Sequence, residues 1–248
     1  MHTGRLNRGD GTHLAYASTP GAGPAPTTIV LPGFHSDMTG AKALALESWC
    51  HNAGSACLRL DYSGHGASDG AFTDGTIGIW TADALTLIDA LTEGPLLLVG
   101  SSMGGWIALL IALARPHRTA GLIGIAAAPD FTETLMWNAM MPGERATLER
   151  EGVLHLPSQY GDPTPITHRL IEDGRNHLLM ANPIPIPCPV RLLHGQNDPD
   201  VPWETALRLA EQIESPNVQT TLIKDGDHRL SRPTDLEALR HLHASILP

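Results

Sequence analysis

The segment Leu96–Trp106 has the sequence LLLVGSSMGGW. Its first four residues form a continuous apolar run, which is typical of a parallel strand that is buried on both faces. Gly104–Ala114 has the apolar spacing of a helix. Between them, Gly100–Gly104 matches the pattern G-x-S-x-G. In this context the pattern predicts a nucleophile elbow, a strained turn that exposes the hydroxyl of Ser102. The alternative is an ordinary turn whose serines cap the next helix.

Outward from this segment, short apolar runs alternate with stretches of helical spacing. The expected strands are Thr28–Leu31, Ala56–Leu60, Leu96–Val99, Leu122–Ala126, Val190–Leu193 and Thr220–Ile223. The expected helices are Ala41–Asn52, Ile77–Leu91, Gly104–Ala114, Trp203–Ile213 and Leu236–Ile246. This alternation predicts an α/β fold with a doubly wound, mostly parallel sheet. The turn residues Gly9, Asp10 and Gly11 between Leu6 and Leu14 predict an antiparallel hairpin at the start.

The alternation stops between residues 129 and 189, and a connection this long inside a compact domain is usually functional. Met136–Met140 and Thr167–His177 have helical spacing, so we expect a small helical cap inserted in one domain of residues 1–248. A disordered loop is the alternative, but the segment is rich in apolar side chains. The cap follows a strand and so reaches the edge of the sheet where α/β folds bind ligands. We expect it to line the site with Leu135, Trp137, Met140 and Met141.

The composition of the chain indicates in which cellular compartment it works and which partners it does not bind. Hydrophobic residues make up 42% and charged residues 17% of the chain, as in ordinary globular proteins. The net charge of -10, without a cluster of Lys and Arg, argues against a nucleic-acid partner. Cys50, Cys57 and Cys188 lack the spacing of a zinc site or a disulfide framework, which favours a reducing compartment. Neither an apolar leader nor a long apolar run is found, so we expect a cytoplasmic protein without a transmembrane helix.

A carboxylate that could assist Ser102 follows the expected strand Val190–Leu193. A serine hydroxyl becomes a nucleophile when a base takes its proton and a carboxylate orients that base. In folds with this elbow, the chain order is serine, acid, histidine. Asp198 is favoured as the acid because of its spacing to Val201, which opens the next helix. Asp200 is the rival candidate.

The candidate base is His228. The chain has 13 histidines, so any one of them has a low prior as a catalyst. His228 is the exception because it lies in the loop after the last expected strand and before the last helix, on the same edge as the elbow. His65 and His194 flank glycines in turns and are interpreted as structural.

Two backbone N–H groups are candidates for an oxyanion hole, which acyl transfer requires. The elbow supplies the N–H of Met103, the residue after the nucleophile. The second donor is expected from the loop after the first central strand, where Gly33 permits a tight turn that directs the N–H of Phe34 into the site. An ordinary turn at the end of a strand is the alternative for this loop.

The chain resembles the α/β-hydrolase superfamily over nearly its whole length from about Thr28. The resemblance is closest to the branch of mitochondrial acyl-glucuronide esterases and protein depalmitoylases. It is carried by Leu31–Phe34 with Ser36–Met38, Asp61–Gly64 with Ser68–Gly70, Gly100–Trp106, Pro183–Pro185, Arg191–Gly195 with Asp198 and Val201–Trp203, and Asp227–Arg229. No mitochondrial presequence is seen, which indicates a bacterial-type relative.

The resemblance implies hydrolysis of carboxylic esters or thioesters through an acyl-enzyme, on a small-molecule or acylated substrate. Ser102, Asp198 and His228 match the family's triad, and Phe34 and Met103 match its oxyanion donors. No metal or cofactor is expected, because a triad needs only protons and preorganised dipoles. A carbon–carbon bond hydrolase or a perhydrolase could use the same triad. A non-catalytic binding module is a further alternative, since a fold alone does not guarantee activity.

Overall fold

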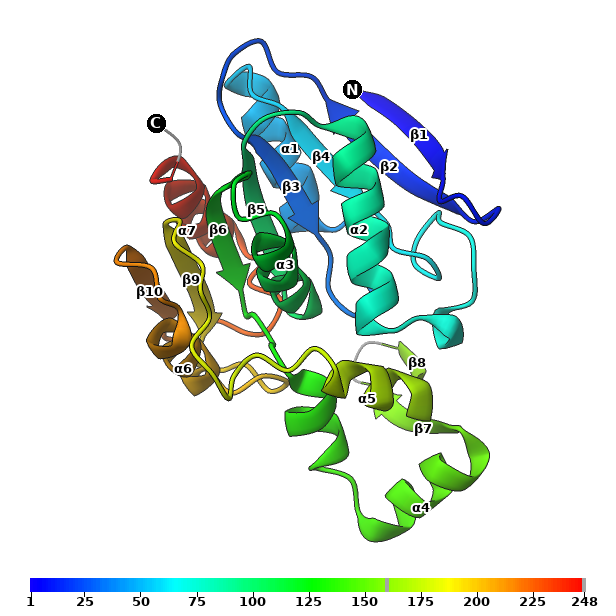
Figure 1. Cartoon of the computed structure of the whole chain (residues 1–248). Coiled ribbons are helices and arrows are strands. Elements are labelled where there is room, and N and C mark those ends of the chain that lie inside the picture. Colours follow the sequence, from blue (N-terminus) through cyan, green and yellow to red (C-terminus); the bar gives the residue numbers. More distant parts are fainter. Residues whose placement is uncertain (159–160, 247–248) are drawn as a thin grey trace.

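A mostly parallel sheet of eight strands forms the centre of the molecule, in the order β1-β2-β4-β3-β5-β6-β9-β10 (Figure 1). The computed structural model describes residues 1–158 and 161–246. The strands of this sheet are β1 (His2–Asn7), β2 (His13–Thr19), β3 (Thr27–Leu31), β4 (Cys57–Leu60), β5 (Leu96–Ser101), β6 (Thr119–Ile125), β9 (Val190–Gly195) and β10 (Val218–Ile223). The six strands from β4 to β10 in this order are parallel, and β2 runs antiparallel to β4. The predicted N-terminal hairpin is confirmed, because β1 pairs with β2 and Leu6 lies opposite Leu14.

Helices cover both faces of the sheet. They are α1 (Ala41–Asn52), α2 (Ile77–Leu91), α3 (Met103–Ala114), α6 (Glu204–Gln212) and α7 (Pro233–Ala244). One buried cluster joins α1 and α7 to alternate residues of the central strands, and a second joins α2, α3 and α6 to the opposite face. The two apolar faces explain why the central strands are almost continuously buried and were visible in the sequence as unbroken apolar runs.

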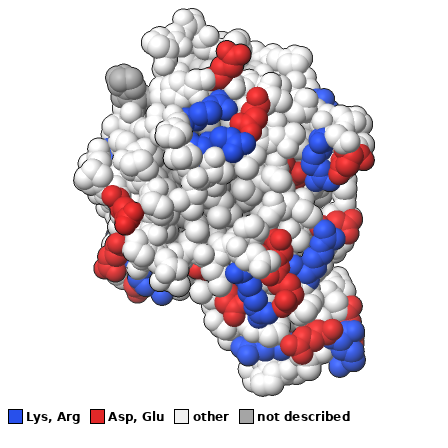
Figure 2. All heavy atoms as spheres, viewed as in Figure 1, with Lys and Arg blue, Asp and Glu red and all other residues white. Residues whose placement is uncertain are grey.

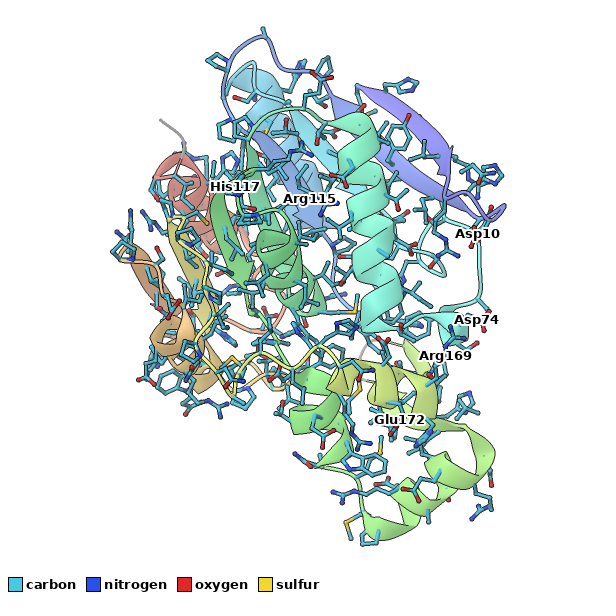
Figure 3. All side chains as sticks on the ribbon, viewed as in Figure 1. Asp10, Asp74, Arg115, His117, Arg169 and Glu172 are labelled. Atoms are coloured by element: carbon cyan, nitrogen blue, oxygen red, sulfur yellow. The ribbon has the colours of Figure 1, made fainter. Side chains whose placement is uncertain are left out.

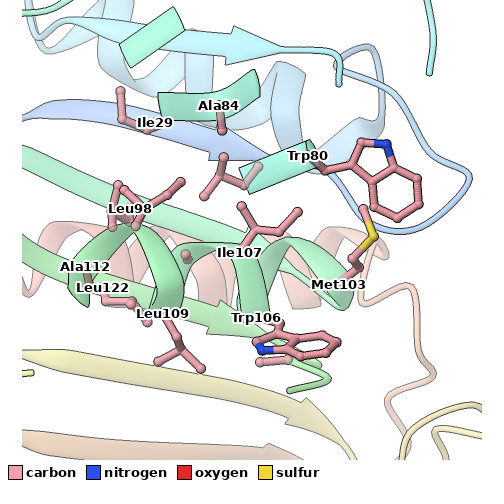
Figure 4. Close-up of a cluster of buried hydrophobic side chains, with 14 of the residues drawn as sticks. Ile29, Trp80, Ala84, Leu98, Met103, Trp106, Ile107, Leu109, Ala112 and Leu122 are labelled. Atoms are coloured by element: carbon pink, nitrogen blue, oxygen red, sulfur yellow. The ribbon is translucent and has the colours of Figure 1, made fainter. Parts of the chain in front are cut away.

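The larger of the two clusters lies under the nucleophile turn. Figure 4 shows Trp106, Ile107 and Met103 of α3 packed with Trp80 and Ala84 of α2. All five side chains are fully buried. Full burial of a large apolar side chain contributes about 1.5–3 kcal/mol. This packing therefore fixes the start of α3, and with it the turn that precedes it.

Residues 126–189, between the neighbouring strands β6 and β9, form an insert at the edge of the sheet where the parallel strands end (Figure 1). Its elements are the π-helical turn η2 (Thr132–Trp137), α4 (Pro142–Glu151), the antiparallel hairpin of β7 (Val153–Ser158) and β8 (Gly161–Thr167), and α5 (His168–Arg175). The predicted helical piece Thr167–His177 corresponds to α5, whereas Met136–Met140 overlaps η2 only at Met136 and Trp137. Helix α4 and the hairpin are elements that we did not predict.

Hydrogen bonds close the insert on itself and join it to the helices of the core. The Asp130 carboxylate accepts from the N–H groups of Leu179 and Met180 at 2.8 and 2.9 Å. The Trp106 indole on α3 donates to the carbonyl of His177 at 3.1 Å. The N–H of Gly78 on α2 donates to the Asp173 carboxylate on α5 at 2.8 Å. Strand β8 of the insert also packs against the short helix η1 (Phe72–Asp74). In Figure 3, Asp74 of η1 and Arg169 of α5 lie on the same side of the molecule, where η1 approaches the insert.

Basic side chains on the face seen in Figure 2 lie beside acidic ones. For example, the Asp89 carboxylate forms ion pairs with both Arg115 and Arg118, at N–O distances of 2.5 and 3.2 Å.

The three cysteines are buried free thiols. Among the described residues, no helix is both long and apolar enough to cross a membrane.

Candidate active site

Ser102 occupies a strained turn between β5 and α3. Its φ of 54° and ψ of -118° lie in a region that non-glycine residues rarely adopt. The glycines on either side are required, because a Cβ on Gly100 would lie 2.1 Å from the carbonyl oxygen of Gly104, and one on Gly104 would lie 2.1 Å from that of Leu31. The turn is held in place by the N–H of Ser102, which donates to the carbonyl of Ile125 at 2.9 Å. The predicted strand, strained turn and helix are therefore all present.

Asp198 and His228 are brought together from the loops after β9 and β10. His228 Nδ1 lies 2.8 Å from Asp198 Oδ2, and the Asp198 side chain is 1% exposed. The other carboxylate oxygen accepts from the N–H groups of Asp200 and Val201 at 2.8 and 2.9 Å. The carboxylate that is hydrogen-bonded to His228 is therefore that of Asp198, the acid favoured on spacing. The backbone of its rival Asp200 helps to hold that acid.

His194 at the end of β9 is a partner of Asp198 that the sequence analysis did not identify. Its Nε2 lies 3.1 Å from Asp198 Oδ2 and 3.1 Å from the carbonyl of Val201, and its side chain is fully buried. Since a carbonyl can only accept, Nε2 carries a proton and donates. The one available signal was the spacing of four residues between His194 and Asp198, which places both near the end of one strand.

The Asp198 carboxylate is ionised despite its burial. Burial opposes ionisation, but hydrogen bonds from His194 and His228 hold the pKa of the carboxyl below its usual range. Asp198, Asp200 and His228 also offer potential metal-ligand atoms within 4.8 Å of one another. The two oxygens of Asp198 already accept from four N–H groups, so a cation at this place would have to displace one of them. The pair is suited to proton transfer.

A cavity of about 960 Å³ lies over Ser102 and His228, both of which line it. Its apolar wall includes Phe34 from the loop after β3, together with Phe131, Leu135 and Met136 from the insert. Polar and charged groups, including those of Lys42, Asp200 and Arg229, line other parts of the cavity. A serine, a histidine and a long apolar wall thus face one space that is large enough for a small-molecule substrate.

The two predicted oxyanion donors flank Ser102. Phe34 lines the cavity, and a Cβ placed on Gly33 would lie 3.4 Å from the Cβ of Ser102, so this loop is packed against the nucleophile turn. Met103 is the first residue of α3, and the N–H of a first helical residue has no acceptor within its helix. Its side chain is buried in the core on the Trp80 side of α3 (Figure 4).

The expected lining of the cap needs correction. Leu135 lines the cavity as expected, but Trp137, Met140 and Met141 do not. Met140 is buried in a separate cluster inside the insert, and Met141 is 67% exposed. The apolar residues that were missed are Ala128, Phe131 and Met136, the last next to Leu135 on η2.

Trp137 contacts two cations of the insert. The guanidinium groups of Arg145 and Arg175 lie over its ring, 5.2 and 4.7 Å from the ring centroid. Arg145 also donates to the carbonyl of Trp137 at 3.0 Å. This stacking makes Trp137 part of the internal packing of the insert.

Comparisons with known proteins identify the relatives of this chain. Residues 23–169 match the family model described as serine aminopeptidase, S33. The chain is 42% identical over 236 residues to the palmitoyl-protein thioesterase ABHD10, mitochondrial, of Homo sapiens, covering 94% of this chain and 76% of that protein. Among solved structures, a protein from Agrobacterium vitis S4 has a TM-score of 0.95 and 41% identity, covering 100% and 98% of the two chains. The mouse alpha/beta hydrolase domain-containing protein 10 has a TM-score of 0.91 and 39% identity, covering 99% and 98%.

Proposed function

Because the chain belongs to the serine aminopeptidase S33 family of α/β-hydrolases, we propose that it hydrolyses carboxylic esters and thioesters through an acyl-enzyme on Ser102. The observation that carries the assignment of roles is the 2.8 Å hydrogen bond between His228 and the buried Asp198, with His228 and the strained Ser102 lining one cavity. An oriented histidine and an exposed serine hydroxyl are the parts that nucleophilic acyl transfer needs.

The proposed acylation step follows from this geometry. His228 Nε2 takes the proton of the Ser102 hydroxyl as its oxygen attacks the acyl carbonyl. Asp198 accepts from the Nδ1–H of His228, so it fixes the tautomer and stabilises the imidazolium that forms. The N–H groups of Phe34 and Met103 donate to the oxyanion of the tetrahedral intermediate.

Collapse of that intermediate breaks the bond to the leaving group. His228 returns its proton to the leaving alcohol or thiol, and the acyl group stays on Ser102. A water molecule then attacks the acyl-enzyme and gives its proton to His228. As the second tetrahedral intermediate collapses, the bond to Ser102 Oγ breaks, His228 returns the proton to that oxygen, and the carboxylic acid is released. The chain's own residues supply every proton transfer in this scheme.

The acyl portion of the substrate is proposed to be apolar. Phe131, Leu135 and Met136 form an apolar wall from the insert on the same cavity as Ser102. Each methylene buried on such a wall contributes about 0.8 kcal/mol. The human relative is named a palmitoyl-protein thioesterase, so S-acyl thioesters are included in the proposal alongside oxygen esters.

The proposal is tested by kinetic profiling of the purified chain. Substrates are p-nitrophenyl esters and acyl thioesters of graded chain length, with an aminoacyl p-nitroanilide because the family description names an aminopeptidase. Ester and thioester turnover that is absent from Ser102→Ala is the expected result. Faster turnover of the anilide, or ester turnover that survives in Ser102→Ala, would overturn it.

Labelling by a fluorophosphonate probe gives an independent test. Only an activated hydroxyl attacks such an electrophile, so peptide mapping is expected to place the adduct on Ser102. An adduct on the neighbouring Ser101 would overturn the assignment of the nucleophile.

We also propose a cytoplasmic location. The support is that all three cysteines are buried free thiols, which suits a reducing compartment. The human and mouse relatives are named mitochondrial. Fractionation of the source cells would distinguish a cytoplasmic from a mitochondrial location.

A further inference from the structure

The loop Pro32–Met38, here called the oxyanion loop, carries the Phe34 N–H and needs external support. It is irregular in backbone, because His35 has a φ of 59° in the left-handed region that non-glycine residues seldom adopt. It also lies against the nucleophile turn, since a Cβ on Gly33 would come within 3.2 Å of the Ser101 carbonyl oxygen. A strained loop keeps such a conformation only when its surroundings hold it there.

Three side chains that follow β4 supply hydrogen bonds to the backbone of this loop. The Tyr62 hydroxyl donates to the carbonyl of Pro32 at 3.2 Å. The N–H of His35 donates to Nε2 of His65 at 3.3 Å. Farther along the loop, the N–H of Met38 donates to Asp61 Oδ1 at 2.7 Å, so the three bonds lie on both sides of Phe34.

The three side chains are themselves fixed. Asp61, Tyr62 and His65 are 1%, 0% and 4% exposed, so water competes little for their bonds. Asp61 also accepts from the N–H of Ala67 at 2.9 Å, and the His65 ring packs edge-on against Trp80 with centroids 5.1 Å apart.

His65 holds one tautomer in this arrangement. Its Nε2 accepts from a backbone N–H, so it carries no proton, and its Nδ1 lies 3.3 Å from the carbonyl oxygen of Ser63, to which it donates. The His65 ring is thus fixed between two backbone groups, the carbonyl of Ser63 and the N–H of His35 in the oxyanion loop.

We propose that Asp61, Tyr62 and His65 are positioning residues that hold the Phe34 N–H where the oxyanion of the reaction forms. The inference rests on the proposed function, because it assigns a purpose to the loop only if acyl transfer occurs at Ser102. An oxyanion donor contributes through its preorganised place about 3 Å from the developing charge, so loss of a bond beside it lowers transition-state binding more than substrate binding.

The first test uses Tyr62→Phe and His65→Leu in the full chain. Tyr62→Phe removes one hydroxyl and keeps the ring in the core. We expect both variants to lower kcat for a short p-nitrophenyl ester by about tenfold to a hundredfold, with KM changed by less than about threefold. Affinity for an alkyl trifluoromethyl ketone, whose adduct with the serine carries an oxyanion, should fall in proportion to kcat/KM.

Two comparisons separate positioning from a general loss of stability. Asp61→Asn keeps an acceptor oxygen toward the Met38 N–H and should retain more activity than Asp61→Ala. Leu239→Ala, on a fully buried residue of α7 in the other core cluster, is the stability control and should leave kcat and ketone affinity unchanged at a temperature where it is folded. Unchanged kcat and ketone affinity in folded Tyr62→Phe and His65→Leu would overturn the inference.

Failure of the proposed function gives a different result. In that case the wild-type chain itself neither turns over the esters nor reacts with the fluorophosphonate at Ser102. If the wild type is active, Ser102→Ala is inactive and the loop variants equal the wild type, then only the positioning role is wrong.

Discussion

The Nε2 of His194 lies 3.1 Å from Asp198 Oδ2, the same oxygen that accepts from His228. One buried carboxylate oxygen therefore serves two histidines, and only one of them faces the cavity. The bond from His194 therefore helps to hold Asp198 in the position from which it accepts from His228.

Removal of this second donor should weaken catalysis. In His194→Phe, kcat for a p-nitrophenyl ester is expected to fall by about tenfold, because the carboxylate that orients His228 loses one of the bonds that hold it. The buried carboxylate also loses a partner, which should cost about 1–3 kcal/mol of stability. His194→Gln retains an N–H donor and is the matched control. Equal kcat values for folded His194→Phe and the wild type would rule out this coupling.

Asp198→Asn and Asp200→Asn form a matched pair that tests the identity of the acid. Asp198→Asn should reduce ester turnover by about three orders of magnitude or more in a folded protein, because the asparagine favours the wrong tautomer of His228. Asp200→Asn should stay within about tenfold of the wild type, since its contact with Asp198 is made by its backbone. Circular dichroism checks folding, and the reverse order of effects would make Asp200 the acid.

Substitutions in the wall of the cavity should alter chain-length preference. Leu135→Ala and Met136→Ala remove apolar surface that lines the cavity, so the optimum among p-nitrophenyl esters should shift while acetyl-ester turnover stays within about tenfold. Met141→Ala, at an exposed position of the same insert, is the control and should keep the wild-type profile. A profile that is unchanged in both wall variants would place the acyl group elsewhere.

Trp137→Ala should affect stability without changing that profile. The guanidinium groups of Arg145 and Arg175 both lie over the indole ring, and its loss leaves them without their aromatic partner. We expect faster proteolysis within the insert and an unaltered chain-length optimum. A shifted optimum with unchanged proteolysis would return Trp137 to the cavity wall.

Acid should destabilise the chain through His65. Burial lowers the pKa of His65 from 6.5 to about 4. Between these values the unfolded chain binds a proton that the native state does not, so the free energy of unfolding falls as the pH decreases through this window, by up to about 3 kcal/mol. Urea unfolding at pH 7 and pH 4.5 should show a larger loss for the wild type than for His65→Gln. Equal losses in the two proteins would contradict the assignment.

The sequence predicted the sheet and its helices closely because their signals are local. Ala41–Asn52 and Ile77–Leu91 have the predicted bounds, since apolar spacing defines a buried helical face within one or two turns. The hairpin of β7 and β8 was missed because β8 contains Pro163 and Pro165, which interrupt the alternation expected of a strand.

Only those residues of the candidate site that directly follow a strand could be predicted from the sequence. Ser102, Asp198 and His228 each follow a strand of one parallel sheet, so their common edge could be predicted from the sequence. The contacts of Trp137 with two arginines span 8 and 38 residues of the chain, for which a local apolar pattern gives no signal. The same holds for the bonds of Tyr62 and His65, which join segments about 30 residues apart.

The Asp130 carboxylate closes the insert into a loop of about fifty residues, because it binds Leu179 and Met180 near the other end. The strands on either side, β6 and β9, are neighbours in the sheet. The two ends of the insert therefore meet over adjacent strands. Lengthening, shortening or exchanging what lies between them need not move the strands that carry Ser102 and Asp198. One buried acid thus makes the insert a structural unit that can change in length or sequence without displacing the strands beside it.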